Sequence, residues 1–333
     1  VGPYTNILDG RDISYKATGH FGELVLTGDA HIDDLLAPKS PRFNLDLEGP
    51  NIDEITAMLG INDLGGGGFS LRTRGVQVDD RYEADINGRI GDISLSASAQ
   101  TSDIEAFREV DLNVAINGPS LGAVTGLFGV ENWPDKPFSL KAGAERVGST
   151  LNVHDMTLNI GGTKLLLDAL LTEFPTLEAS RIKLVISGEE IEQFHELLGV
   201  KGAATGPFNM KGNLSVSPEG VELLKVDLST SLGQAKLSGT LGDPPGYIGS
   251  KLDVHLDGSN ANSVMSAFEI DMLPEEPFNI NARVELVEKG LVVERGVLVT
   301  IGNERLEAGG FISFAPGSQG TDIDLKLKGE HFA

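Results

Sequence analysis

The feature that most constrains the fold of this chain is a sequence pattern that recurs about every 70 residues. In each copy, a run of alternating apolar and polar residues ends on a glycine. These reference glycines, which lie 69, 70, 70 and 71 residues apart, are Gly49, Gly118, Gly188, Gly258 and Gly329. A fixed period of this length indicates a repeat protein, in which each unit is stabilised by packing against its neighbours.

The residues before each reference glycine alternate with period two. Apolar side chains stand two, four and six places before the glycine, and polar residues fill most of the positions between them. Because successive side chains of a strand point to opposite faces, one face of each of these strands is apolar. The residues that we expect to line a shared apolar groove are Leu45, Leu47, Leu112, Val114, Ile116, Leu184, Ile186, Leu252, Val254, Leu256, Leu325 and Leu327.

The period changes after the glycine. Apolar residues recur three, six, nine and ten places on, as at Leu121, Val124, Leu127 and Phe128, which predicts a helix of about two and a half turns. The expected N-cap residues are Asn51, Ser120 and Asn260. Such a short helix is marginal in water by itself, so we expect it to pack on the sheet.

A phenylalanine stands twenty residues after each of the first four glycines and begins a new alternating run. These residues are Phe69, Phe138, Phe208 and Phe278. The strands that follow are joined by connections too short for parallel crossovers, which favours an antiparallel meander.

The sequence therefore predicts a mainly β fold with one short helix and about four strands in each unit of about 70 residues. We expect an elongated repeat array, whose antiparallel sheet curls so that its apolar face forms a groove. The predicted divisions are the tail of an incomplete repeat at 1–42, repeat units at 43–109, 110–180, 181–250 and 251–320, and the start of a truncated repeat at 321–333.

Composition limits the possible functions. The formal net charge of −23 argues against a nucleic-acid partner, because phosphate backbones are bound by cationic surfaces. The chain has no cysteine, and its six histidines lack metal-ligand spacing. Its carboxylates do not form a recognisable acid and base pair. We therefore expect no enzymatic activity, no catalytic residue, no metal and no cofactor.

The repeated elements together resemble the AsmA-like family, whose members include TamB and YhdP. The resemblance rests on strand, glycine and helix segments such as "VDLNVAINGPSLGAVTGLFG" and "KLVISGEEIEQFHELLG", and on the following "GPFNM", "DKPFSL" and "EEPFNI". It implies a segment of the periplasmic repeat region of a parent protein anchored to the bacterial inner membrane. It also implies phospholipid acyl chains as the ligand, the inner and outer membranes and envelope proteins as partners, and no catalytic residues.

Three functions remain open at this point. The first is a segment of a bridge-like lipid-transfer conduit, in which acyl chains pass along the apolar groove and outer-membrane integrity depends on the transport. The second is a structural scaffold or assembly factor for outer-membrane biogenesis, whose core is filled by its own side chains. The third is an acidic cell-surface adhesin built from repeats. The exposure of the apolar face separates the first two, because a conduit leaves that face accessible and a filled core buries it.

Overall fold

The structure, a computed structural model, describes residues 10–34, 41–52, 67–103, 109–122, 135–173, 179–194, 205–217, 220–242, 247–266, 274–313, 322–325 and 328–329. The fold is mainly β, and consecutive strands pair in antiparallel register. The predicted fold class, mainly β with antiparallel strands and short helices, is therefore confirmed. The chain forms two compact units, unit 1 at Val1–Gly161 and unit 2 at Gly162–Ala333.

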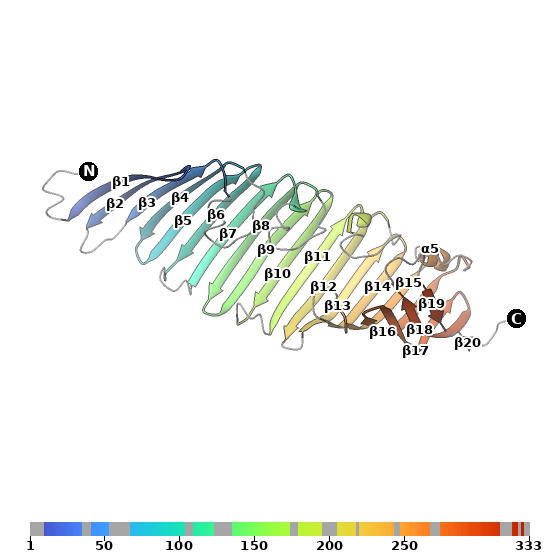
Figure 1. The fold of residues 1–333 in the computed structure, drawn as a ribbon. Coiled ribbons are helices and arrows are strands. Elements are labelled where there is room, and N and C mark those ends of the chain that lie inside the picture. The colour runs from blue at the N-terminus through green and yellow to red at the C-terminus, as the bar shows by residue number, and fades with distance from the viewer. Residues whose placement is uncertain are drawn as a thin grey trace. The chain divides into compact units, whose positions relative to one another are not determined.

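Unit 1 is a meander in which each described strand pairs with the next one along the chain, from the blue to the green part of Figure 1. Its strands are β1 (Arg11–Phe21), β2 (Leu24–Asp34), β3 (Arg42–Gly49), β4 (Phe69–Val78), β5 (Arg81–Ile90), β6 (Ile93–Thr101), β7 (Glu109–Gly118), β8 (Phe138–Val147) and β9 (Thr150–Ile160).

Unit 2 continues the same order of pairing, and its strand β18 pairs with both β19 and β20. Its strands are β10 (Thr163–Leu171), β11 (Ser180–Gly188), β12 (Phe208–Ser217), β13 (Gly220–Thr230), β14 (Gly233–Leu241), β15 (Lys251–Gly258), β16 (Phe278–Val287), β17 (Gly290–Ile301), β18 (Glu304–Ser313), β19 (Asp322–Leu325) and β20 (Lys328–Gly329). Its described helices are the 3₁₀ helix η1 (Ile191–Phe194) and the α-helix α5 (Ala261–Ser266).

Tight turns connect many neighbouring strands. Gly22, Gly91 and Gly302 each begin a two-residue loop with a positive φ of 62°, 54° and 56°. Two-residue hairpin loops need this left-handed conformation because it matches the twist of the strands, and glycine adopts it without a steric penalty. The short loops thus explain why the chain forms a meander.

Each reference glycine in the described repeats lies directly opposite the phenylalanine that begins the next strand. The pairs are Gly49 with Phe69, Gly118 with Phe138, Gly188 with Phe208, and Gly258 with Phe278. A Cβ atom added to Gly118 would lie 2.7 Å from Cε1 of Phe138, so the ring covers the bare backbone of the glycine. The four phenylalanines are 6–9% exposed, and they form the centre of the core at this end of the strands.

The first residue of each expected helix completes this core. Ile52, Leu121, Ile191 and Ala261 are all buried. The backbone N–H of each donates to the carbonyl fifteen residues further on, over distances of 2.9–3.2 Å, at Gly67, Lys136, Gly206 and Glu276. In each of these four repeats, the same backbone hydrogen bond therefore joins the two ends of the segment between the reference glycine and the phenylalanine.

The predicted helices are described only at their first turns. In unit 2, α5 begins after Asn260, whose Oδ1 accepts a hydrogen bond of 3.0 Å from the N–H of Ser263. This confirms the predicted N-cap at Asn260. The equivalent segment at η1 is a 3₁₀ helix in its described part, which differs from the α-helix predicted there. The remaining parts of the predicted helices, at 53–60, 123–129, 195–199 and 267–269, lie outside the described residues.

Candidate functional site: the apolar face of the sheet

The predicted groove residues whose side chains the structure describes share one face of the sheet within each unit. We call this the apolar face, and define it by Leu47 and Ile116 in unit 1, by Ile186 and Leu256 in unit 2, and by their cross-strand neighbours. Leu47 lies opposite Leu26 on one side and Leu71 on the other. Residues directly opposite each other in an antiparallel ladder project to the same face, so this register joins separate strands into one surface.

Continuous apolar rows cross the strands of each unit. In unit 1, one row consists of Leu26, Leu47, Leu71, Gly88, Leu95, Ile116, Leu140 and Leu158. In unit 2, the matching row consists of Leu165, Ile186, Met210, Leu228, Ala235, Leu256, Ile280, Val299 and Leu306. No polar side chain interrupts either row. The sequence pattern predicted the apolar residues of this face for one strand of each repeat. The strand register identifies the apolar residues that the neighbouring strands contribute to the same face.

The predicted groove residues are only partly covered. Among those whose side chains the structure describes, nine are half-buried and Leu45 is 38% exposed. Two of the nine, Leu47 and Leu256, pack against the buried clusters around Phe69 and Phe278. Leu325 lies in β19, but its side chain is outside the described part, and Leu327 lies outside the described residues altogether. Soluble monomers rarely leave contiguous apolar patches larger than a few hundred Å² in water. The apolar face therefore has the properties of a surface that takes a ligand or partner.

Glycines in the strand interiors allow large neighbouring side chains to lie flat on the apolar face. A Cβ on Gly75 would lie 2.1 Å from the ring of Phe43, and one on Gly88 would lie 2.9 Å from Cδ1 of Leu71. The side chains of Phe43 and Leu71 therefore lie over these glycines instead of projecting away from the sheet. The sequence contains the signal for this packing, since a glycine occupies an apolar position of an alternating run, but the partner of each glycine becomes known only from the register.

The opposite face is rich in polar and charged residues. In unit 1, Arg72 donates to Asp46 across neighbouring strands, and in unit 2 Nε of Arg283 lies 2.8 Å from Oδ1 of Asp253. These hydrogen bonds raise the pKa of both guanidinium groups above the ordinary value. Leu166 and Leu170 of β10 are exposed apolar exceptions on this polar face. The two faces together give the sheet the amphipathic character that the alternating sequence predicts.

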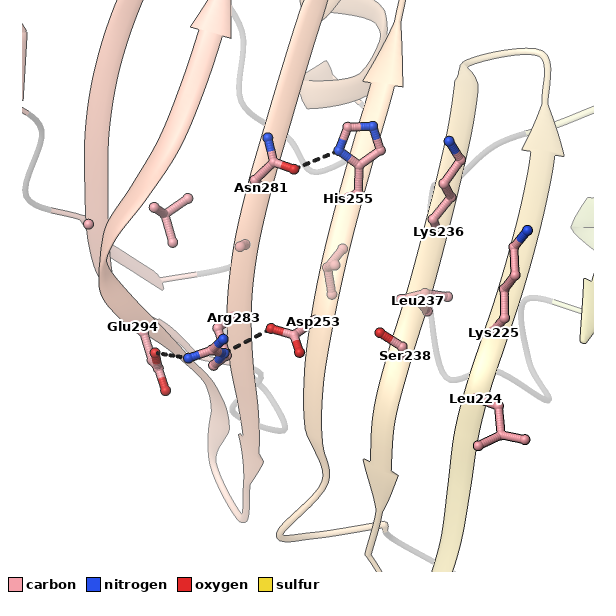
Figure 2. Close-up of a pocket in the computed structure, with 14 residues that line it drawn as sticks. Leu224, Lys225, Lys236, Leu237, Ser238, Asp253, His255, Asn281, Arg283 and Glu294 are labelled. Carbon is pink, nitrogen blue, oxygen red and sulfur yellow. Dashed lines mark hydrogen bonds and ion pairs between the residues drawn. The ribbon is translucent and has the colours of Figure 1, made fainter. Parts of the chain in front are cut away.

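A cavity of about 650 Å³ in unit 2 lies on the polar face. Figure 2 shows Lys225 and Lys236 on one side of it and the cluster of Asp253, Arg283 and Glu294 on the other. A smaller cavity of about 500 Å³ in unit 1 is also lined largely by polar-face residues. Sequence analysis singled out none of these polar residues, because they are dispersed along the chain.

Within the described ranges, no group of three or more histidine, aspartate or glutamate side chains is placed to hold a metal ion. The described helices include none with the length and apolar character needed to cross a membrane.

No family model, curated protein or solved structure matches this chain. The apolar face is therefore the main structural evidence about function.

Proposed function

We propose that the chain is a segment of a bridge-like lipid-transfer conduit, in which the apolar face carries phospholipid acyl chains across the bacterial periplasm. The observation that carries this proposal is the continuous apolar row in each unit, whose members include the half-buried Ile116, Ile186 and Leu256. A filled-core scaffold predicts buried side chains at these positions. Their exposure favours a ligand that is itself apolar.

The physical basis of transfer is the replacement of water around acyl chains. Covering hydrocarbon contributes about 0.8 kcal/mol per CH₂ group, and the same gain is available at every step along a uniform row. Because neighbouring positions are chemically alike, an acyl chain meets no polar barrier as it moves from strand to strand. No covalent step is required, and the phosphate-bearing head group stays in water beyond the apolar face.

The low relief of the face supports sliding. Phe43 lies across Gly75 and Leu71 lies across Gly88, so the large side chains fill the gaps that would otherwise trap a ligand. Mainly aliphatic rows also lack the specific polar contacts that fix a small molecule in one orientation. The surface therefore suits a class of lipids that share acyl chains, rather than one head group.

The proposed setting follows from the resemblance described above. In the parent protein, this segment belongs to the periplasm, an anchor holds it at the inner membrane, and transport supports the integrity of the outer membrane. The proposed partners are phospholipid acyl chains, the two membranes and envelope proteins at the ends of the conduit.

Native mass spectrometry of the purified chain tests the proposal. We expect bound phospholipid, and we expect less of it in the variants Val114→Asp and Ile186→Asp, because an ionised carboxylate on an apolar face is unfavourable for acyl contact. The matched control is Asn113→Asp, which places the same carboxylate on the polar face of the same strand. A folded parent chain that binds no phospholipid from mixed micelles, or equal binding by all of these variants, would contradict the proposal.

A further inference from the structure

Three lysines gather around one carboxylate on the polar face of unit 2. Lys211 of β12 and Lys236 of β14 both lie directly opposite Asp227 of β13. Lys225, also on β13, places its Nζ 3.2 Å from Oδ2 of Asp227. We call Lys211, Lys225 and Lys236 the lysine strip. The register thus places three lysines next to one carboxylate, which pairs with Lys225 alone, in a chain whose formal net charge is −23.

Two register shifts lie beside the lysine strip. The register between β12 and β13 shifts between Asn213 and Leu214, and the register between β13 and β14 shifts between Leu223 and Val226. A bulge inserts an extra residue into one strand and redirects the side chains next to it. Lys225 and Asp227 share a face because they lie two residues apart on one strand, and Lys211 and Lys236 flank Asp227 on the neighbouring strands.

Two arginines on the polar face have acidic partners. Arg283 pairs with Asp253 at 2.8 Å and with Glu294 at 3.6 Å, and Arg72 pairs with Asp46. Within the part of the chain that the structure describes, neither Lys211 nor Lys236 has a carboxylate at ion-pairing distance. The strip is therefore a local excess of positive charge.

The strip also borders a cavity. Lys225 and Lys236 line the space of about 650 Å³ together with Ser238 and His255. In Figure 2 the two lysines lie on neighbouring strands, apart from the cluster around Arg283. Their ammonium groups and the hydroxyl of Ser238 are hydrogen-bond donors, which suits the recognition of oxyanions.

We infer that the lysine strip and the cavity beside it bind a ligand that carries two or more phosphate groups. Neighbouring strands lie about 4.8 Å apart, so Lys211 and Lys236 are anchored about 10 Å from each other, a span that two linked phosphates can bridge. A single exposed ion pair adds little affinity, which is why several charges on one ligand are needed. Lysine acts as a point charge with three donors and binds phosphate without the planar geometry that arginine and carboxylate share.

The negative charge of the rest of the chain does not cancel the positive charge at the lysine strip. At physiological ionic strength the screening length is about 8 Å, so distant carboxylates have little influence at the strip. The phosphate groups can belong to a soluble oligophosphate or to the head groups of anionic phospholipids in a membrane. The site lies on the face opposite the apolar rows, so the inference is independent of the proposed lipid path.

Calorimetric titration of the full chain with inorganic tripolyphosphate tests the soluble source, and co-sedimentation with vesicles tests the membrane source. The vesicles are phosphatidylcholine alone or phosphatidylcholine with phosphatidylglycerol. We expect the double substitution Lys211→Gln and Lys236→Gln to weaken binding at least about tenfold, and added salt to weaken it further. The matched control is Lys141→Gln, which removes a lysine from the polar face of unit 1.

A second variant acts in the opposite direction. Asp227→Asn removes the carboxylate that competes with the ligand, so binding should become several-fold tighter. Loss of tripolyphosphate binding in the double variant supports a soluble ligand, and loss of binding to the phosphatidylglycerol vesicles alone supports a lipid head group. The inference is overturned if the parent binds neither probe, or if the double variant and Asp227→Asn both bind as the parent does.

Discussion

The glycine end of the strands and the middle of the same strands differ in how their apolar side chains are buried. At the glycine end, Phe138 and Leu121 are each 6% exposed. Four residues before Gly118 on β7, Val114 belongs to the same alternating pattern and is only half-buried. The alternating sequence pattern therefore determines which face of the strand is apolar. The phenylalanine ring packed over the glycine determines where the apolar side chains of that face are buried.

The same contrast recurs in both units. In unit 1 a buried cluster joins Leu24, Ile52 and Phe69, and in unit 2 the matching cluster joins Ala261, Phe278 and Ile301. Buried residues in mid-strand, such as Val226 and Val297 of unit 2, lie beside β-bulges. Most of the buried large apolar side chains thus lie at the glycine end of the strands, which leaves much of the apolar face available for a ligand.

Removing a ring from the glycine end should have the largest effect on stability. Phe138→Ala leaves a cavity over Gly118, and we expect the free energy of unfolding to fall by about 3–5 kcal/mol. Val114→Ala in the middle of the neighbouring strand should cost less than about 1.5 kcal/mol, because Val114 is half-buried and loses fewer contacts. Denaturant unfolding of both variants measures the difference. Equal losses would mean that the two regions are not distinct.

A side chain on a reference glycine should have the next largest effect. Gly118→Val places a Cβ 2.7 Å from the ring of Phe138, so the ring must move, and we expect a loss of about 1–3 kcal/mol. The control is Gly19→Ala, since a Cβ on Gly19 meets nothing within 4 Å. Thermal unfolding of the two variants provides the comparison. If Gly118→Val unfolds at the parent temperature, the ring does not pack on the glycine as described.

A smaller effect is expected where strands of unit 2 end away from the glycines. Ser250 is 2% exposed, and its Oγ accepts a hydrogen bond of 2.9 Å from the N–H of Gly242. Ser250→Ala leaves this partly buried N–H without its acceptor, which should cost about 1–2 kcal/mol of unfolding free energy. Ser259→Ala, at an exposed position of the same unit, is the control and should be neutral. A neutral Ser250→Ala would show that water replaces the lost acceptor.

Sequence reasoning succeeded where the signal is local. Period two, the reference glycines and the capping residue Asn260 each depend on a few neighbouring residues, and the structure places all of them as expected. It did not identify the pairing of Gly118 with Phe138, because twenty residues separate the two and the pairing depends on strand register.

The lysine strip was missed for a related reason. Lys211, Lys225 and Lys236 come from three strands, and the strand register, including its shift between Asn213 and Leu214, must be known before they can be placed together. Bulges depend on packing between strands, so a pattern of residues along one strand cannot reveal them. Charge clusters on a sheet are consequently harder to predict than the apolar face itself.

Site-specific photo-crosslinking shows which face of the sheet contacts lipid. A photoreactive residue is placed at Val114 or at its neighbour Ala115, and at Ile186 or at its neighbour Ser187. Both members of each pair are half-buried, and strand alternation puts them on opposite faces. With phospholipid present, we expect lipid adducts at Val114 and Ile186, and little or none at Ala115 and Ser187. Equal labelling within each pair, or labelling of the polar face alone, would contradict the apolar face as the lipid path.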